Sequence, residues 1–401
     1  MPALKNITLK PGKKSAEPNY VLVIHGGAGT MIRDGSTPEQ RAKYKAVLSR
    51  ALKAGYEVLK SGGEAMDAAV EAVSVMEDCP LFNSGHGAVF NVAGKNELET
   101  SLMVSKPPAS HPAMPSSRRG SSVTLITHTR NPSHLARALY LAPQLAPHPM
   151  LSGAAAEATG ALLGVRQVDP SYFWTEARWK EHRRGLGLPE DPVEYPRPEI
   201  PDDTNSETTD VASLSDHKDK ETWEPLDLMP TGTVGAVALD IRGCIAAVTS
   251  TGGFTNKLVG RVGDTPVMGS GFWAEEWERD GGFVKRNWDR LRGKSKYEGV
   301  GVSGTGNGDY YIRRAAASNI ARRMQYLGES LDEATQNVID DLFKEGGLGG
   351  VIALDREGNV ALPLNCGGMY RGVIRPDGVP LTAIFFDEQL TELQAGSTNC
   401  T

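Results

Sequence analysis

The sequence has no long apolar run and few cysteines or histidines. No stretch approaches the ~18 apolar residues that a membrane-spanning helix needs. The first 20 residues are polar with scattered lysines, which argues against a secretory signal. The four cysteines form no CxxC pair, and the eight histidines form no HExxH motif. We therefore expect a cytoplasmic protein with reduced thiols and no membrane contact.

The chain also lacks an excess of positive charge. The formal net charge is −6, so the chain lacks the basic surface that nucleic acid binding requires. Glycine, in contrast, is abundant, with 45 of 401 residues. Many glycines permit sharp turns and close backbone approaches, which suits a site built on loops.

None of three common catalytic or cofactor motifs is present in the form and context that its function requires. Gly299–Gly304 fits GxGxxG, but a loop-like sequence precedes it where a dinucleotide site needs a strand. Gly293-Lys294-Ser295 lacks the earlier glycine of a phosphate loop. No GxSxG occurs, which excludes the serine-elbow mechanism. A nucleotide-binding protein that uses Gly299–Gly304 stays as an alternative that nucleotide titration would test.

An acidic, proline-rich segment divides the chain. Pro189 to Pro230 holds thirteen acidic residues, three basic residues and seven prolines. Such a segment cannot bury enough apolar surface to offset its ordering entropy, so we expect a disordered linker. The predicted organisation is a polar tail (1–18), a first part (19–185), the linker (186–231) and a second part (233–401).

Hydrophobic periodicity predicts strands and helices in both parts. Two segments of the second part, Val237–Ala247 and Ile352–Leu362, resemble each other, and each reads as a strand, a glycine turn and a strand. Hairpins with helices between them favour an α+β layered sandwich. The other predicted strands are 20–24 and 122–127, and the predicted helices are 38–60, 64–77, 309–327 and 331–343.

Thr233 directly follows the acidic segment and begins a strand-like run. A threonine hydroxyl is a poor nucleophile without a base. If the chain were cut before Thr233, the freed α-amine, with a pKa of roughly 7.7–8.0, would supply that base on the same residue. On these residues alone, the simpler interpretation that Thr233 only begins a strand stays open.

Seven motifs, which occur in order along nearly all of the chain outside the linker and the tail, change that balance. With them the chain resembles the plant-type (type 2) asparaginase/isoaspartyl peptidase family of N-terminal nucleophile hydrolases. The motifs are Ile24–Gly29, Glu77–Phe90, Gly232–Asp240, Thr249–Lys257, Gly260–Asp264, Val302–Gly306 and Met369–Gly372.

The resemblance implies a four-layer αββα sandwich that is made as an inactive precursor. Thr233 would attack the Gly232 carbonyl, and hydrolysis of the resulting ester would leave associated subunits 1–232 and 233–401. The family typically forms a dimer of such heterodimers. The implied reaction is hydrolysis of the L-asparagine side-chain amide or of β-aspartyl dipeptides, with release of L-aspartate.

The resemblance also assigns roles to single residues. Thr233 would be the nucleophile and its α-amine the base, with Thr251 orienting it and Asn83 in support. Arg261 would bind the substrate α-carboxylate, for which a bidentate guanidinium is well shaped. Asp264 would bind the α-ammonium group. The Thr305 hydroxyl and the Gly306 N–H would form the oxyanion hole, and Gly308 would line the substrate site.

No cofactor is required by this resemblance, but a structural sodium ion is implied. Main-chain carbonyls would bind it, and carbonyl oxygens suit a hard cation whatever the side chain. The residues that correspond in this chain are Met76, Glu77, Cys79, Phe82, Ser84 and His86.

The chain departs from the family pattern beside the site. The family usually has Met-Asp-Gly after its Glu-Leu-Asp segment, whereas here Glu97-Leu98-Glu99 leads to Met103-Val104-Ser105. A Pro/Ser-rich insertion covers 104–119, and Gly304-Thr-Gly-Asn-Gly-Asp309 stands in place of the usual Gly-Thr-Gly-Glu. These changes leave substrate preference and the rate of self-cleavage open. A non-catalytic or slowly processed relative that binds an amino acid or a partner is the main alternative. A glycosylasparaginase would need a secretory signal, and nothing favours a threonine aspartase.

Overall fold

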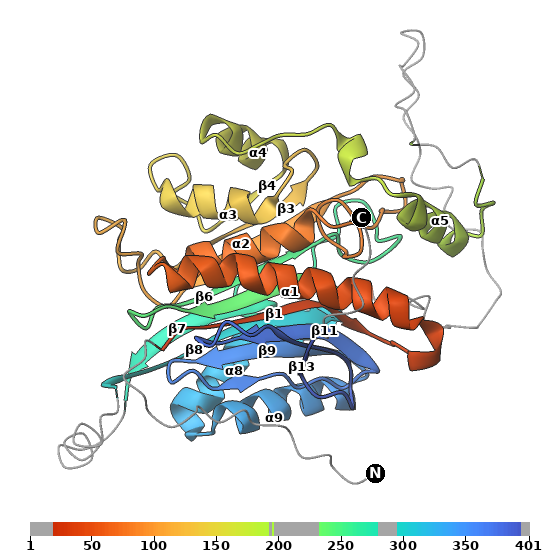
Figure 1. The fold of residues 1–401 in the computed structure, drawn as a ribbon. Coiled ribbons are helices and arrows are strands. Elements are labelled where there is room, and N and C mark those ends of the chain that lie inside the picture. The colour runs from red at the N-terminus through yellow and green to blue at the C-terminus, as the bar shows by residue number, and fades with distance from the viewer. Residues whose placement is uncertain (1–18, 192–194, 196–231, 280–294, 394–401) are drawn as a thin grey trace.

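The computed structural model describes residues 19–191, 195, 232–279 and 295–393. The predicted tail 1–18 and most of the predicted linker 186–231 lie outside these residues. In the described part, strands and helices form a mixed α/β fold with two stacked sheets (Figure 1). None of the described helices is long and apolar enough to cross a membrane.

The larger sheet contains nine of the described strands, and β1 and β5 lie at its centre. Neighbouring strands pair antiparallel except for the parallel pair β3 and β4. The strand order is β13 (Thr391–Glu392), β12 (Leu381–Phe385), β11 (Gly368–Ile374), β1 (Val21–Gly29), β5 (Val234–Leu239), β6 (Ile245–Thr251), β2 (Leu98–Val104), β3 (Gly120–Ile126) and β4 (Met150–Ser152).

The smaller sheet contains four of the described strands, all antiparallel. It packs against the larger sheet through β7, β8 and β9, which contact β1, β5, β6 and β2. The strand order is β10 (Val360–Ala361), β9 (Gly349–Asp355), β8 (Tyr297–Gly306) and β7 (Phe272–Glu278).

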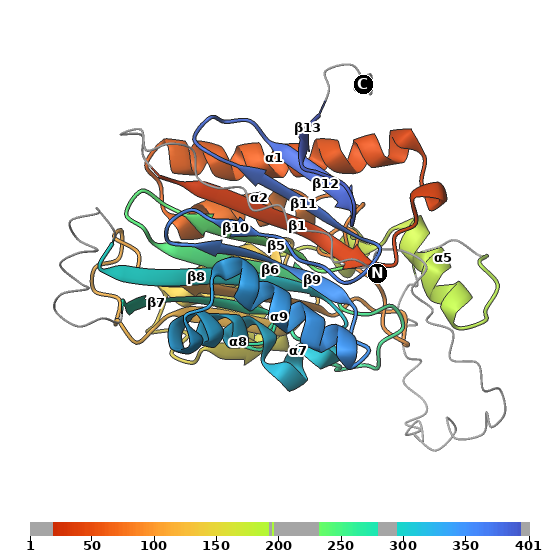
Figure 2. The same cartoon turned by 90° about the horizontal axis from the view of Figure 1, so that it is seen from below.

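Helices cover the outer faces of the two sheets. On the larger sheet lie α1 (Pro38–Lys60), α2 (Ala65–Glu77) and α3 (Pro132–Leu141), with α4 (Gly153–Leu162) beside β3. On the smaller sheet lie α8 (Ala316–Arg322) and α9 (Leu331–Lys344), which stand in front of β8 and β9 in Figure 2. The remaining helical segments are α5 (Glu176–Gly185), α7 (Gly308–Arg314), the 3₁₀ turns η1 (Arg33–Gly35) and η2 (Pro170–Phe173), and the π-helical turn η4 (Arg323–Leu327).

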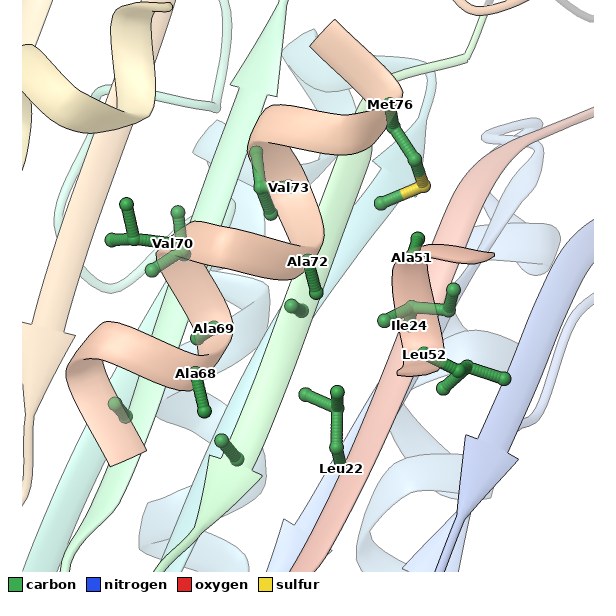
Figure 3. Packing of buried hydrophobic residues seen from close by; sticks show 14 of the residues in the cluster. Leu22, Ile24, Ala51, Leu52, Ala68, Ala69, Val70, Ala72, Val73 and Met76 are labelled. Atoms are coloured by element: carbon green, nitrogen blue, oxygen red, sulfur yellow. The ribbon is translucent and has the colours of Figure 1, made fainter. Parts of the chain in front are cut away.

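Strand alternation divides the core between the two faces of the larger sheet. Leu22 and Ile24 of β1 pack under the helices, whereas Val21 and Val23 pack between the sheets. Figure 3 shows the helix side, where the buried alanines and valines of α2 lie beside Leu22 and Ile24 of β1 and Ala51 and Leu52 of α1. Small residues on α2 allow the helix backbone to approach the sheet closely. Successive strand residues point to opposite faces, so a central strand between two apolar layers is apolar throughout.

The predicted elements are present, with three differences. The predicted helix 38–60 matches α1, which a Thr37 capping box begins. Strand β1 runs on to Gly29, with an irregularity between His25 and Ala28, instead of ending at Ile24. The predicted helix 309–327 is interrupted at Ala315, whose φ of 47° is left-handed. The sequence directly before Gly299 was expected to be a loop. Strand β8 instead begins at Tyr297 and includes all of Gly299–Gly304.

Candidate active site

Thr233 lies at one end of the gap between the two sheets. It directly precedes β5, where Val234 points toward the helices. Alternation therefore turns Thr233 and Gly235 to the opposite face, toward the smaller sheet. The position of Gly235 agrees, since a Cβ there would clash with Ser303 of β8. Thr233 itself is buried.

The peptide bond before Thr233 is pressed against the glycine motif of β1. A Cβ on Gly27 would lie 2.8 Å from the Gly232 Cα and 2.9 Å from its carbonyl oxygen. A Cβ on Gly232 would lie 2.5 Å from the Ala28 nitrogen. Gly27 also has a φ of 113°, which side chains rarely adopt. The glycines therefore permit a main-chain contact that fixes the Gly232–Thr233 peptide.

A buried hydrogen-bond chain lies behind the threonine. His25 pairs with Gly235 in the register of β1 and β5, and its Nε2 lies 2.8 Å from the Ser303 hydroxyl. The Ser303 hydroxyl lies 2.8 Å from that of Thr249. Burial lowers the pKa of His25 to about 3, so the imidazole is neutral. These groups hold the strands around Thr233 without adding charge.

Thr251 ends β6 beside Thr233. Val234 pairs with Ser250, so the next position outward on each strand is Thr233 and Thr251. The described residues show no hydrogen bond between these two hydroxyls; the Thr251 hydroxyl accepts the Gly253 N–H at 3.0 Å and keeps its own proton to donate. Cross-strand placement nevertheless brings both side chains to the same face.

Asn83 supports the turn that follows Thr251. Its side-chain amide donates to the Gly253 carbonyl at 2.7 Å, and its side-chain oxygen accepts the Val89 N–H at 3.0 Å. Its own carbonyl accepts the Gly252 N–H at 3.0 Å. Asn83 thus forms two hydrogen bonds with the loop after β6 and one with Val89, and it does not line the pocket.

Arg261 and Asp264 extend from the same loop between β6 and β7. The Arg261 guanidinium lies 4.6 Å from the centre of the Phe254 ring and pairs with Asp309 at 2.9 Å. The Asp264 carboxyl is buried, and burial together with the nearby Glu99 charge raises its pKa to about 7. A Cβ on Gly308 would clash with the Asp264 carboxylate, so a glycine is needed there.

Thr305 and Gly306 end β8 on the opposite side of the gap. The Thr305 hydroxyl accepts the Ala28 N–H at 3.2 Å, which leaves its own proton free to donate. Thr305 is fully buried and does not line the pocket, whereas Gly306 does. A Cβ on Gly306 would clash with the Leu348 carbonyl.

These positions surround one pocket, with a cavity volume of about 90 Å³. It brings together Gly232, Thr233, Thr251, Arg261, Asp264, Gly306 and Gly308 from the list of predicted site residues. Both predicted parts of the chain contribute. The other lining residues are Ala28, Gly29, Thr30, Glu99, Gly253, Phe254, Asn307 and Leu348.

Comparison with known proteins decides the family. The model of a family described as asparaginase matches residues 18–278 and 295–384. The chain belongs to this asparaginase family. The sequence-based assignment to it, as a hydrolase of amide bonds, is confirmed.

Individual members of the asparaginase family match over almost their full length. The isoaspartyl peptidase of Escherichia coli K12 is 36% identical over 91% of this chain and 96% of its own length. The isoaspartyl peptidase/L-asparaginase of Xenopus laevis is 30% identical, over 93% and 98%. The mouse protein of the same name is 31% identical, over 90% and 89%.

Two acidic residues of the site were missed as functional candidates. Glu99 was noted only as a departure from the asparaginase pattern, and Asp309 likewise. The signal for Glu99 in the sequence was a single charged residue between Leu98 and the uncharged run Thr100–Val104. In the structure this strand, β2, is buried at every position. For Asp309, sequence alone offered no indication of its contact with Arg261, which lies 48 residues away.

The loop expected to bind sodium follows α2. The carbonyls of Met76, Glu77 and Cys79 accept the N–H groups of Cys79, His86 and Phe82 at 3.2, 2.7 and 3.3 Å. The Met76 carbonyl also accepts the Asp78 N–H, whereas the Glu77 and Cys79 oxygens each keep a second lone pair, which fits a cation that binds main-chain oxygens. The His86 ring bonds the Tyr172 carbonyl and acts as a loop residue. Sodium binding by Met76, Glu77, Cys79, Phe82, Ser84 and His86 stays a prediction.

Proposed function

We propose that this protein hydrolyses the side-chain amide of L-asparagine and the β-aspartyl bond of isoaspartyl dipeptides, with release of L-aspartate. The observation that carries this proposal is the pocket in which the strand-initial Thr233 lies together with Arg261 and the buried carboxylate of Asp264. These groups match an amino acid end that carries both an α-carboxylate and an α-ammonium. The names of the relatives point to the same bonds.

The first step is self-cleavage at Gly232–Thr233. The Thr233 hydroxyl attacks the Gly232 carbonyl, the bond to nitrogen breaks, and an ester joins the two residues. Water hydrolyses the ester, which leaves a carboxylate on Gly232 and a free α-amine on Thr233. The contact of Gly232 with Gly27 and Ala28 supports this step, because it holds the bond in one geometry.

Substrate hydrolysis then uses the same hydroxyl. The α-amine of Thr233 accepts the hydroxyl proton, and the oxygen attacks the substrate amide carbonyl. The Thr305 hydroxyl and the Gly306 N–H stabilise the oxyanion, and the amine group leaves with the proton. Water then releases L-aspartate from the ester. Arg261 binds the substrate α-carboxylate. Asp264 and Gly308 line the part of the site that holds the α-ammonium group. Thr251 orients the nucleophile, with support from Asn83.

The finer structural predictions belong to the same proposal. We assign the stacked sheets and their covering helices to the four-layer αββα sandwich of N-terminal nucleophile hydrolases. Residues 19–185 and 233–401 then form one domain, and two cleaved heterodimers associate. A cytoplasmic location stays a prediction from the sequence.

Intact mass and product assays test the proposal. After incubation at neutral pH, we expect two species that match residues 1–232 and 233–401. Thr233→Ala should remain one chain, and Thr233→Ser, which keeps a hydroxyl, should still cleave. The cleaved protein should release ammonia from L-asparagine and L-aspartate from a β-aspartyl dipeptide. Cleaved protein that acts on neither compound would overturn the proposed substrates, and a permanently uncut chain would overturn the mechanism.

A further inference from the structure

Glu99 is a buried carboxylate in the pocket that the proposed chemistry does not use. It lies on β2 and is 1% exposed. Glu99 pairs with Thr251 in the register of β2 and β6, and Thr251 is the cross-strand neighbour of Thr233. Directly opposed residues point to one face of a sheet. Thr233, Thr251 and Glu99 therefore form a row across three strands, with Glu99 at the end beside the substrate-binding loop.

Only one of the two Glu99 carboxylate oxygens has hydrogen-bond donors. Oε1 accepts the Gly263 N–H at 2.8 Å and lies 3.5 Å from the Thr124 hydroxyl. Oε2 is buried and has no partner among the described residues, and the same is true of Oδ2 of Asp264. A buried carboxylate oxygen without a donor is costly. Glu99 and Asp264, each with one such oxygen, line the same small pocket.

Neighbouring cations are committed elsewhere. The ammonium group of Lys257 donates to the Glu97 carbonyl at 2.6 Å, and Arg261 pairs with Asp309. Within the described ranges, neither cation forms an ion pair with Glu99 or Asp264. The charged groups around Glu99 are Lys257, Arg261 and Asp264, and Asp264 also has Asp309 nearby. Burial raises the pKa of Glu99, as it does that of Asp264.

Space around the loop is consistent with this arrangement. A Cβ on Gly263 would lie 3.0 Å from Oε2 of Glu99 and 2.7 Å from Nη1 of Arg261. The free oxygen of Glu99 and the guanidinium therefore flank the same glycine. A substrate whose carboxylate binds Arg261 would bring its α-carbon substituents close to this oxygen.

We propose that Glu99 and Asp264 form a carboxylate pair that binds the α-ammonium group of the substrate, so that Glu99 determines specificity for a free amino acid end. This inference rests on the proposed function. An ammonium group has three donors and no acceptor, so it can satisfy both unpartnered oxygens at once. Its positive charge also relieves the repulsion between the two carboxylates.

A purely structural role for Glu99 makes a different prediction. Glu99 would then only anchor the Gly263 N–H and balance the charge of Lys257. Its removal would disturb the loop and weaken every ligand that binds Arg261, whether or not the ligand carries an ammonium group. Ligands that differ in that group alone therefore separate the two roles.

The test compares the inhibition constants of L-aspartate and succinate against asparagine hydrolysis. Succinate keeps both carboxylates and lacks the ammonium group. In Glu99→Gln we expect the constant for L-aspartate to rise about tenfold, since a charged hydrogen bond is lost. The constant for succinate should stay within about twofold. KM for L-asparagine should rise in parallel, with kcat nearly unchanged.

Glu97→Gln is the matched control. Glu97 lies two residues away and accepts the Gly260 N–H of the same loop at 3.0 Å, but it does not line the pocket. We expect it to leave the ratio of the two inhibition constants unchanged. Glu99→Asp keeps the charge with a shorter reach and should retain more preference for L-aspartate than Glu99→Gln.

Equal weakening of both inhibitors in Glu99→Gln would overturn the proposal, and so would unchanged constants. If Glu99→Gln does not fold, Glu99→Asp replaces it and must still lower the preference for L-aspartate. A wild-type protein that hydrolyses neither L-asparagine nor a β-aspartyl dipeptide would instead contradict the proposed function. In that case direct titration with L-aspartate and succinate decides the present inference, and equal binding of both would overturn it.

Discussion

The guanidinium of Arg261, which lines the pocket, and the carboxylate of Asp309 lie 2.9 Å apart, although they are 48 residues apart in sequence. The Asp309 side chain is 65% exposed, whereas that of Arg261 is 18% exposed. In the proposed function a substrate carboxylate needs the same guanidinium. The ion pair therefore competes with the substrate.

Removal of this competitor should strengthen substrate binding. We expect Asp309→Asn to lower KM for L-asparagine by up to about fivefold, which corresponds to the ~0.2–1 kcal/mol typical of an exposed ion pair. Steady-state kinetics at low ionic strength measure the effect. Asp341→Asn, which removes the exposed pair with Lys344, is the control and should leave KM unchanged. A higher KM in Asp309→Asn would show that Asp309 orients Arg261 instead.

The contact between Gly27 and Gly232 predicts a block of self-cleavage. In Gly27→Ala, the new Cβ would meet the Gly232 main chain at 2.8 Å, and the φ of 113° would add strain. We expect most of this variant to stay uncut under conditions in which the wild type is fully cut, as measured by intact mass. Gly164→Ala has a comparable φ of 83° with nothing within 4 Å, so it should cut normally. Normal cutting of Gly27→Ala would contradict the fixed geometry.

The raised pKa of Asp264 predicts a pH dependence of substrate binding. Its value of about 7 lies above the usual range, so the carboxyl is protonated at low pH and charged above 7. Ammonium binding needs the charged form. We expect KM for L-asparagine to fall as pH rises through about 7, whereas titration of the Thr233 α-amine changes kcat. A KM that is constant from pH 6 to 8 would contradict this role.

The same shift has a consequence for stability. Between the unfolded pKa of roughly 3.9 and the folded value of about 7, the folded state binds more protons. The contribution of Asp264 to the free energy of unfolding therefore falls as pH rises through this window. Asp264→Asn should flatten that part of the pH dependence of thermal stability, measured against the wild type. An unchanged profile would mean that Asp264 is charged throughout.

Substitution of Thr305 by alanine should lower kcat. Loss of one oxyanion-hole donor typically costs ~10²–10³ in kcat. We expect a loss of that order for Thr305→Ala in protein that has already been cut, whereas Thr305→Ser should retain most activity. Single-turnover kinetics separate this effect from slow processing. Because Thr305 also accepts the Ala28 N–H, thermal unfolding must show that the alanine variant is folded.

Local patterns in the sequence indicated much of the fold. Hydrophobic periodicity predicted α1 to its final bounds, 38–60, because this signal lies within the helix itself. The break at Ala315 was not predictable in this way. Alanine favours a helix, and tertiary packing held that residue at a φ of 47° against its own preference.

Motifs in the sequence were enough to identify the family and to single out Thr233 and the loop with Arg261 and Asp264 as candidate site residues. Short motifs of special residue types carry that information, and they need no knowledge of distant neighbours. Which other side chains lie next to these residues became visible only in the folded structure. The register of β2 and β6 places Glu99 beside Thr251, and the fold brings Asp309 to Arg261. Cross-strand register and burial depend on the whole chain, so neither contact could be predicted from local pattern.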